Sequence, residues 1–400
     1  MELLSPAGNT EKLKAALHFG ADAVYLSGKK FGLRAASDNF DADELKSAVE
    51  LVHKNGKKVY VALNILAHDA DFDGMEEYVR YLDEIGADAV IVSDLGILSL
   101  VRKATPSLAV HVSTQASVTN GYAAKFYADL GVARIVLARE LSLNEIAAIR
   151  EILPREVELE AFVHGAMCIS YSGRCLLSDY TAGRHANHGE CAQSCRWEYA
   201  VAEKTRGEYM PVEQDGRGTY IFNSKDLNMI EHIPKLAAVG VHSLKIEGRV
   251  KSAYYVGSVT NAYRRALDIY ESGKDCRLPK NIIDCLYKTS HRKFTTGFYF
   301  GEGGGQCYET AKPQSDYDFC GVVTEQCADG VIFEMRNRFR TGDMLEVLSS
   351  GCDDGKSFEA GEMKDADGNV VTDAKIVRQR LFIKTPFELS AGDMFRKKIK

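Results

Sequence analysis

Short apolar runs alternate with amphipathic stretches along the first 270 residues of the chain. The apolar runs are rich in Val, Ile and Leu, as in ADAVYLSG (21–28) and ADAVIVSD (87–94), whereas DADELKSAVELVHKNG (41–56) has helical periodicity. Ser142 and Glu145 form a capping-box pattern. Glycines stand where helix C-caps are expected, at Gly20, Gly56, Gly86, Gly131 and Gly240. The repeating unit is therefore a strand followed by a helix, and the pattern contains eight strands.

Eight strands separated by helices predict an α/β fold, most simply a (β/α)8 barrel of the TIM type, with an open doubly wound sheet as the alternative. We expect this barrel to span residues 1–273. An insertion after the seventh strand, residues 166–217, interrupts the repeat. Long insertions at the C-terminal face of a barrel are usually functional.

The pattern changes near residue 296, where helical periodicity gives way to short alternating segments broken by Gly and Asp. Two GDM triplets, at 342–344 and 392–394, are each typical of a turn that leads into a strand. We therefore predict a small antiparallel β-barrel domain over residues 296–400, with residues 274–295 as a helical connector.

Polar side chains share one face of several predicted barrel strands. In HSLKIEGR (242–249), alternation places Lys245, Glu247 and Arg249 together, opposite Leu244 and Ile246. Charged groups are unfavourable against an apolar helix layer, so we expect them to face the barrel interior and its mouth. The same reasoning selects Asn64, His111, Gln115, Glu160 and His164. Such a set predicts a substrate site; an internal salt-bridge network that fills the barrel is the alternative.

Four of the ten cysteines, Cys168, Cys175, Cys191 and Cys195, lie in the predicted insertion. The chain shows no export signal, and no apolar run approaches the roughly 20 residues of a membrane span. We therefore expect a cytoplasmic protein, where clustered thiols are more often metal ligands or catalysts than disulfides. Four thiolates suit structural zinc or an iron–sulfur cluster, and spacing leaves both open. A thiol protease is less favoured, although His164 is close to Cys168 in sequence.

The net charge of −6 and the pI near 6.0 argue against a chain that attracts nucleic acid over its whole surface. An RNA partner would need a local basic face. The candidate residues fall in three groups: Arg184, His185, His188 and Arg196; His291, Arg292 and Lys293; and the terminal run RKKIK.

Residues 160–178, EAFVHGAMCISYSGRCLLS, closely resemble the signature of the collagenase-like U32 peptidase family. The matching residues are Glu160, Phe162, Gly165, Ala166, Met167, Cys168, Gly173, Cys175 and Ser178. Further similar segments are ELLSPAGN (2–9), NSKDL (223–227), KIEGR (245–249) and RKFTTGFYFG (292–301), so the resemblance covers nearly the whole chain.

The resemblance implies a four-iron four-sulfur cluster and oxygen-independent hydroxylation. In members of this kind the substrate is the wobble uridine of tRNA, a cytidine of large-subunit rRNA or the ubiquinone ring, and the RNA-acting members depend on prephenate. The chain resembles most those members that make 5-hydroxyuridine in tRNA. The residues of this chain that match the cluster ligands of those members are Cys168, Cys175, Cys191 and Cys195, of which Cys195 matches least firmly.

On this resemblance, Lys245 and Arg249 would hold a carboxylate such as those of prephenate, and Glu160, His164 or Glu247 would move protons. Further expected substrate-binding residues are Lys225, Asp226, Gln115, His111 and Asn64. The C-terminal domain is similar to the second domain of translation factors, which fits a tRNA partner, and a partner subunit is a further expectation. The alternatives are a peptidase, as the family name says, a hydroxylase acting on rRNA, and a non-catalytic scaffold with structural zinc.

Overall fold

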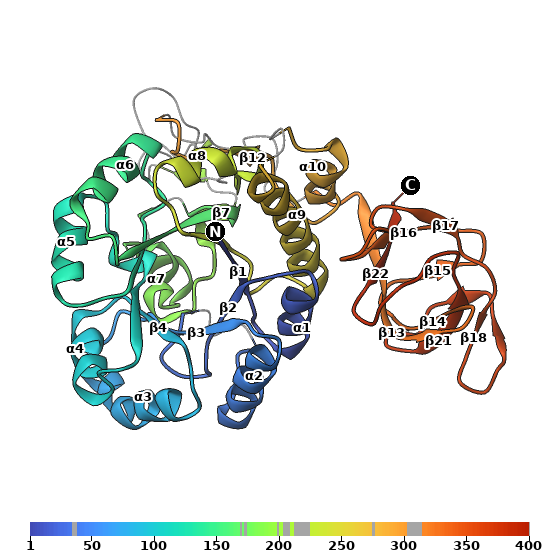
Figure 1. Ribbon diagram of the computed structural model, residues 1–400, viewed down its shortest axis with the longest axis horizontal. Coiled ribbons are helices and arrows are strands. Elements are labelled where there is room, and N and C mark those ends of the chain that lie inside the picture. Colours follow the sequence, from blue (N-terminus) through green and yellow to red (C-terminus); the bar gives the residue numbers. More distant parts are fainter. Residues whose placement is uncertain are drawn as a thin grey trace. The chain divides into compact units, whose positions relative to one another are not determined.

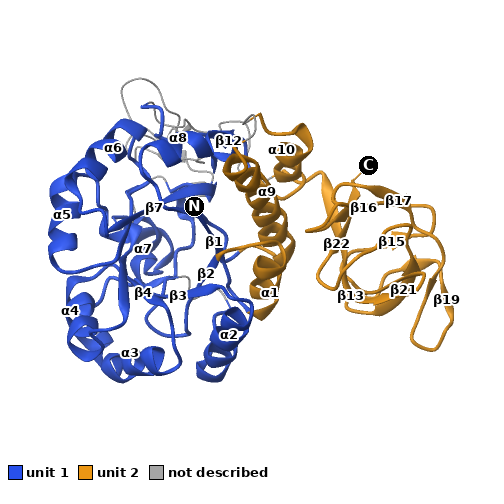
Figure 2. Ribbon diagram, viewed as in Figure 1, with its two compact units in different colours: residues 1–9, 23–250, 292–313 blue, residues 10–22, 251–291, 314–400 orange. Residues whose placement is uncertain are grey.

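The computed structural model describes residues 1–33, 38–168, 170–171, 174–197, 200–202, 209–211, 225–273, 277–301 and 314–399. The chain divides into two compact units that interleave along the sequence (Figure 2). Unit 1 comprises residues 1–9, 23–250 and 292–313, and unit 2 comprises residues 10–22, 251–291 and 314–400. The units therefore differ from the predicted consecutive domains, because residues 10–22 and 251–291, which hold helices that follow barrel strands in sequence, group with the C-terminal strands.

Unit 1 contains the barrel (Figure 1). Within the described residues, eight parallel strands form a closed ring in which β11 pairs with both β1 and β7. Closure confirms the barrel over the doubly wound alternative. The strands are β1 (Glu2–Pro6), β2 (Ala23–Leu26), β3 (Lys58–Leu63), β4 (Ala89–Val92), β5 (Ala109–Val112), β6 (Arg134–Val136), β7 (Glu158–Ala166) and β11 (Ser243–Ile246).

The described helices of unit 1 are α2 (Ala42–Lys54), α3 (Met75–Glu84), α4 (Leu95–Ala104), α5 (Gly121–Asp129), α6 (Leu143–Ile152), α7 (Leu177–Ala182) and α8 (Ile233–Ala238). In Figure 1 α2 to α6 lie outside the ring. Helices α2, α3 and α4 bury apolar side chains, among them Val49, Val79 and Val101. The capping box of Ser142 and Glu145 is confirmed at the start of α6. Gly86 and Gly240 follow α3 and α8 with φ of +83° each, a conformation that only glycine adopts readily.

Shorter elements complete unit 1. Short 3-10 helices are η1 (Asp69–Phe72), η2 (Thr114–Ala116), η3 (Ala186–His188), η4 (Ser194–Arg196) and η5 (Ile230–His232). Short strands are β8 (Ala200–Ala202), β9 (Tyr209–Pro211), β10 (Asp226–Asn228) and β12 (Phe294–Thr295). β10 pairs antiparallel with the end of β7, and the next helix, α8, starts at Ile233.

Unit 2 holds the C-terminal sheet and three helices, α1 (Thr10–His18), α9 (Ala253–Glu271) and α10 (Lys280–Tyr287). The strands are β13 (Tyr317–Cys327), β14 (Gly330–Met335), β15 (Phe339–Arg340), β16 (Met344–Leu348), β17 (Ser357–Glu359), β18 (Met363–Lys364), β19 (Val370–Val371), β20 (Asp373–Ala374), β21 (Arg380–Lys384) and β22 (Met394–Lys398). They pair antiparallel around a core that includes Phe333, Phe339 and Phe395. The antiparallel β-domain predicted from the sequence is confirmed.

Both GDM triplets are turns that lead into strands, β16 and β22, as predicted. Gly342 and Gly392 have φ of +88° and +106°. The carboxylates of Asp343 and Asp393 accept backbone N–H groups three residues earlier, at 2.8 and 2.9 Å. Each triplet therefore combines a left-handed glycine with a carboxylate that closes the turn.

No helix in the described part of the chain is both long and apolar enough to cross a membrane.

Candidate functional site

A small cavity lies inside the barrel at the carboxyl ends of its strands. It has a volume of about 50 Å³. The structure brings five predicted site residues together around it: Asn64, Gln115, Lys245, Glu247 and Arg249. The other lining residues are Tyr25, Leu33, Ala62, Ile91, Ser113, Thr114, Arg139 and Phe162. In barrels this end of the strands is where substrates bind.

A second cavity of about 250 Å³ shares Leu33, Asn64 and Gln115 with the first. Its wall also includes Arg174 and Asn187, which come from the cysteine-bearing segment. That segment is fixed to the residues after β3, where the Leu66 N–H donates to the Asn187 carbonyl at 3.1 Å. His188 Nε2 donates to the Leu66 carbonyl at 2.9 Å. The cysteine-bearing segment therefore covers one side of the barrel mouth.

Lys245 forms the floor of the smaller cavity. Its Nζ lies 2.6 Å from Glu160 Oε1 and 4.5 Å from the centre of the Tyr25 ring. Glu160 is fully buried and also binds Arg134, with 3.0 Å between Oε2 and Nη1. Arg134 in turn binds Glu2 at 2.6 Å. The internal salt-bridge network that the sequence left as an alternative therefore exists, beneath the cavity.

This network determines the charge of Glu160. Burial by itself would raise the pKa of the Glu160 carboxyl, but the cations of Lys245 and Arg134 outweigh burial and hold that pKa below its usual range. An ionised carboxylate with both oxygens engaged is a poor proton donor. Glu160 does not line either barrel cavity, and its position suits the orientation of Lys245.

His111 is also inside the barrel, below the cavity. It is buried, and its ring meets the Tyr60 ring edge-on at 4.6 Å. Burial, followed by the charge of Arg134, holds the pKa of the His111 imidazole well below its usual value. His111 is therefore neutral and contributes packing at a position that does not line the cavities.

The sequence placed His164 inside the barrel, and this placement was wrong. A β-bulge shifts the register between β7 and β11, so that Lys245 pairs with Phe162 but Ile246 pairs with His164. His164 consequently shares the outward side of Ile246, and its ring lies 5.4 Å from the Phe294 ring. One extra residue in a strand inverts the alternation beyond it.

Lys225 precedes β10 and Asp226 is its first residue, and neither lines the two barrel cavities. Asp226 is buried, its carboxylate accepts the Arg292 N–H at 3.0 Å, and it lies 3.4 Å from Arg292 Nη1. The pair holds β12 beside β10. The basic group predicted around Arg292 is thus partly used for structure, as is Arg396 of the terminal run, which is buried against Glu346.

The four predicted ligand cysteines are free thiols, with Cys168 exposed and the others half-buried. Two hydrogen bonds join the regions around them: the Ala192 N–H donates to Ser178 Oγ at 3.0 Å, and Thr181 Oγ1 donates to Ser194 Oγ at 2.6 Å. Among the residues that the structure describes, no group of three or more His, Cys, Asp or Glu side chains could hold a metal ion. The donor set itself, four thiols on one segment, suits a thiophilic metal group.

Arg139 is a site residue that the sequence analysis missed. It lies in the loop after β6 (Arg134–Val136), lines the smaller cavity and is only 9% exposed. Its Nη1 donates to the Ala166 carbonyl at 2.9 Å, and its guanidinium lies 4.6 Å from the Phe162 ring centre. Its buried Nε has no hydrogen-bond partner in the described residues. The sequence did carry a signal for Arg139, since site residues of a barrel come from the ends of its strands and the loops that follow them.

Arg249 is the second guanidinium of the cavity. It is 4% exposed, and its Nη2 donates to Asn39 Oδ1 at 2.7 Å. Lys245 forms an ion pair with Glu160, and Arg139 and Arg249 place two further cations at the cavity wall, together with the Glu247 carboxylate. A buried guanidinium binds a planar carboxylate through two parallel hydrogen bonds.

Family models match both parts of the chain. The model described as Peptidase family U32 matches residues 8–307, and the model described as Peptidase family U32 C-terminal domain matches residues 315–396. The chain belongs to peptidase family U32. The resemblance found in the signature residues is thereby confirmed.

Relatives of this chain carry two kinds of name. The "tRNA hydroxylation protein P1" of Bacillus subtilis is 38% identical and aligns with 99% of this chain and 94% of its own length. The "tRNA hydroxylation protein P" of Escherichia coli is 38% identical, over 87% of this chain and 86% of its own. A protein named "Collagenase" from Porphyromonas gingivalis is 33% identical, over 76% of this chain and 75% of its own. Membership in family U32 alone therefore does not choose between RNA modification and proteolysis.

Proposed function

We propose that this protein hydroxylates tRNA, converting the wobble uridine to 5-hydroxyuridine with prephenate as co-substrate. The names of the two tRNA hydroxylation relatives, which align over most of their length, support the tRNA part of the proposal. The observation that carries it is the polar cavity at the barrel mouth, with two buried guanidiniums in its wall and the cysteine-bearing segment beside it.

Arg139 and Arg249 would bind the carboxylates of prephenate. Both side chains are more than nine-tenths buried, where a charge-assisted hydrogen bond is stronger than in water. Asn64 and Gln115 belong to both cavities and would orient a polar ligand between them. Glu247 is the carboxylate of the cavity wall and would accept or return a proton there.

Cys168, Cys175, Cys191 and Cys195 would hold a four-iron four-sulfur cluster. When bound, such a cluster supplies one-electron transfer or Lewis-acid chemistry. The protein's own contribution is to fix the segment, through the Ser178 and Thr181 hydrogen bonds and through the contact of His188 with Leu66. Structural zinc is the alternative occupant, and iron with acid-labile sulfide in anaerobically purified protein separates the two.

The experiment that tests the proposal expresses the gene in a host without wobble-uridine hydroxylation, either with or without prephenate synthesis. Mass spectrometry of digested tRNA should find 5-hydroxyuridine-derived nucleosides only in the host that makes prephenate. If these nucleosides appear in both hosts, the reaction does not require prephenate. If they appear in neither host, the protein does not hydroxylate tRNA.

Proteolysis is the second candidate, because one relative is named Collagenase. If the protein is a protease, anaerobically purified protein should cleave denatured collagen. Substitution of a cavity residue such as Glu247 should abolish that cleavage. Cleavage that survives such a substitution would point to a contaminating protease.

A further inference from the structure

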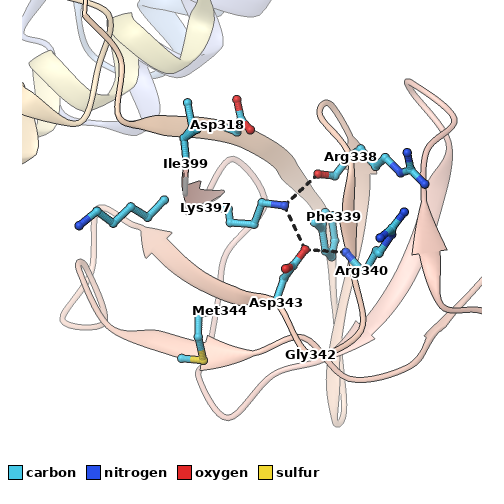
Figure 3. A pocket seen from close by; sticks show the side chains of 10 residues that line it. Asp318, Arg338, Phe339, Arg340, Gly342, Asp343, Met344, Lys397 and Ile399 are labelled. Carbon is cyan, nitrogen blue, oxygen red and sulfur yellow. Dashed lines mark hydrogen bonds and ion pairs between the residues drawn. The ribbon is translucent and has the colours of Figure 1, made fainter.

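A groove of about 640 Å³ lies on the β-sheet of unit 2, far along the chain from the barrel site (Figure 3). Four cationic residues line it: Arg338, Arg340, Lys397 and Lys398. We call it the basic groove. The acids among its lining residues are Asp318 and Asp343. In a chain whose net charge is −6, this is a local concentration of positive charge.

The centre of the basic groove is a hydrogen-bonded frame. Lys397 Nζ donates to the Arg338 carbonyl at 3.2 Å and to Asp343 Oδ2 at 3.0 Å. The same Asp343 oxygen accepts the Arg340 N–H at 2.8 Å. Figure 3 shows these three contacts around Lys397. Asp343 and Lys397 therefore largely neutralise each other and fix the backbone that carries the arginines.

The two arginines are held in place but remain open to solvent. Asp373 binds Arg338 Nη2 at 2.6 Å and Arg340 Nε at 3.4 Å, and the hydrogen bond from Arg338 lowers the pKa of the Asp373 carboxyl to about 2. The side chains of Arg338 and Arg340 are still 55% and 61% exposed. In Figure 3 both guanidiniums lie on the same side of the groove. Lys398 is also exposed.

A surface that binds a protein partner needs an apolar anchor at its centre, often an aromatic side chain. Phe339, the aromatic residue among those lining the groove, is fully buried in the core of the sheet, and the exposed apolar side chains of the groove, Met344 and Ile399, are not aromatic. A phosphodiester backbone needs only positioned cations, and a guanidinium matches two phosphate oxygens at once. The chemistry of the groove therefore fits RNA phosphates better than an acidic protein.

We propose that the basic groove binds the phosphate backbone of the tRNA substrate, with Arg340 and Lys398 as its principal contacts. This inference rests on the proposed function, because it supplies a local RNA-binding face in a chain whose net charge is −6. Contacts of this kind to phosphate contribute an affinity that is independent of sequence and dependent on salt.

The test compares two double variants of the full-length protein. Arg340→Ala with Lys398→Ala removes the two proposed contacts. Arg380→Ala with Lys384→Ala removes two exposed cations of β21 that face Glu325 and Asp329, and serves as the matched control. Thermal melting of both should match that of the unsubstituted protein, since all four side chains are exposed.

Binding of the tRNA would be measured from 50 to 200 mM salt, conditions over which each phosphate contact changes the affinity measurably. For the groove variant we expect roughly tenfold weaker binding at about 100 mM salt, and a slope of log affinity against log salt shallower by about 1 to 2. The control variant should bind as the unsubstituted protein does. Equal losses in both variants, or no loss in either, would overturn the proposal.

The outcomes also separate this inference from the proposed function. If the groove variant binds tRNA normally but hydroxylates it poorly, the groove serves a protein partner and the RNA proposal is wrong. If it binds and hydroxylates normally, only the groove proposal fails. If tRNA binding behaves as expected while cellular tRNA lacks the modification, the groove stands and the hydroxylation proposal fails.

Discussion

Lys245 and Glu160 form a buried ion pair across neighbouring barrel strands, with 2.6 Å between Nζ and Oε1. The pair separates two layers of the barrel interior. Above it lies the cavity with its guanidiniums, and below it lies the network of Arg134 and Glu2.

Removing one partner of this pair should destabilise the protein. Lys245→Met leaves the Glu160 carboxylate buried with Arg134 as its remaining cation, and we expect a loss of roughly 3 kcal/mol in the free energy of unfolding. Urea titration measures it. The double variant Lys245→Met with Glu160→Gln should recover much of the loss, since no charge is then left unpaired. If the double variant loses the sum of the two single changes, the two residues are not coupled.

Stability should fall as the pH is lowered below 6.5, because His111 stays neutral in the folded chain. Burial, then Arg134, Lys245 and Lys58, lower the pKa of His111 from its usual value of 6.5, and Glu2 opposes them only in part. The unfolded chain therefore binds a proton below pH 6.5 that the folded chain does not, at a cost of about 1.4 kcal/mol per pH unit. His111→Gln should flatten this part of the stability curve. An unchanged slope in His111→Gln would contradict the assignment.

Arg139 should affect the co-substrate rather than the fold. Arg139→Ala removes a buried guanidinium from the cavity wall, and we expect kcat/KM for prephenate to fall roughly 10- to 100-fold, as for loss of a charge-assisted hydrogen bond. Arg139→Lys keeps the charge but not the planar fork and should recover only part of the loss. If KM for tRNA rises instead while that for prephenate is unchanged, Arg139 belongs to the RNA site.

The metal content of the protein should depend on the cysteines of the cysteine-bearing segment. Cys191→Ser with Cys195→Ser removes two of four proposed thiolates, and we expect anaerobically purified protein to lose most of its iron, its acid-labile sulfide and its visible absorption. Cys352→Ser, an exposed thiol of the other unit, is the matched control and should keep all three. If the unsubstituted protein contains zinc and no acid-labile sulfide, the four cysteines form a structural zinc site and not an iron–sulfur cluster.

The fold could be predicted from the sequence because its signals are local. Strand alternation correctly assigned Lys245 to the interior, and Ser142 and Glu145 marked a helix start that the structure confirms. Alternation predicts which face of a strand a side chain is on, but not how deep in the barrel it lies. It therefore could not distinguish Glu160, which is beneath the cavity, from Glu247, which is at the cavity wall. It also failed at His164, where the bulge depends on pairing with β11, more than 70 residues away in sequence.

The division into units was likewise not accessible from the sequence. Helix α1 has the same amphipathic pattern as other barrel helices, yet it groups with unit 2, where His18 Nε2 lies 2.8 Å from Asp393 Oδ1. Contacts between residues so far apart in sequence produce no periodic pattern of hydrophobic and polar residues.

The central claim, hydroxylation of the wobble uridine, is tested most directly by deleting the gene and analysing the organism's digested tRNA by mass spectrometry. The account predicts that 5-hydroxyuridine-derived nucleosides disappear, return with a plasmid copy of the gene or of its Cys352→Ser variant, and do not return with the Cys191→Ser, Cys195→Ser variant. Unchanged amounts of these nucleosides in the deletion strain would contradict it.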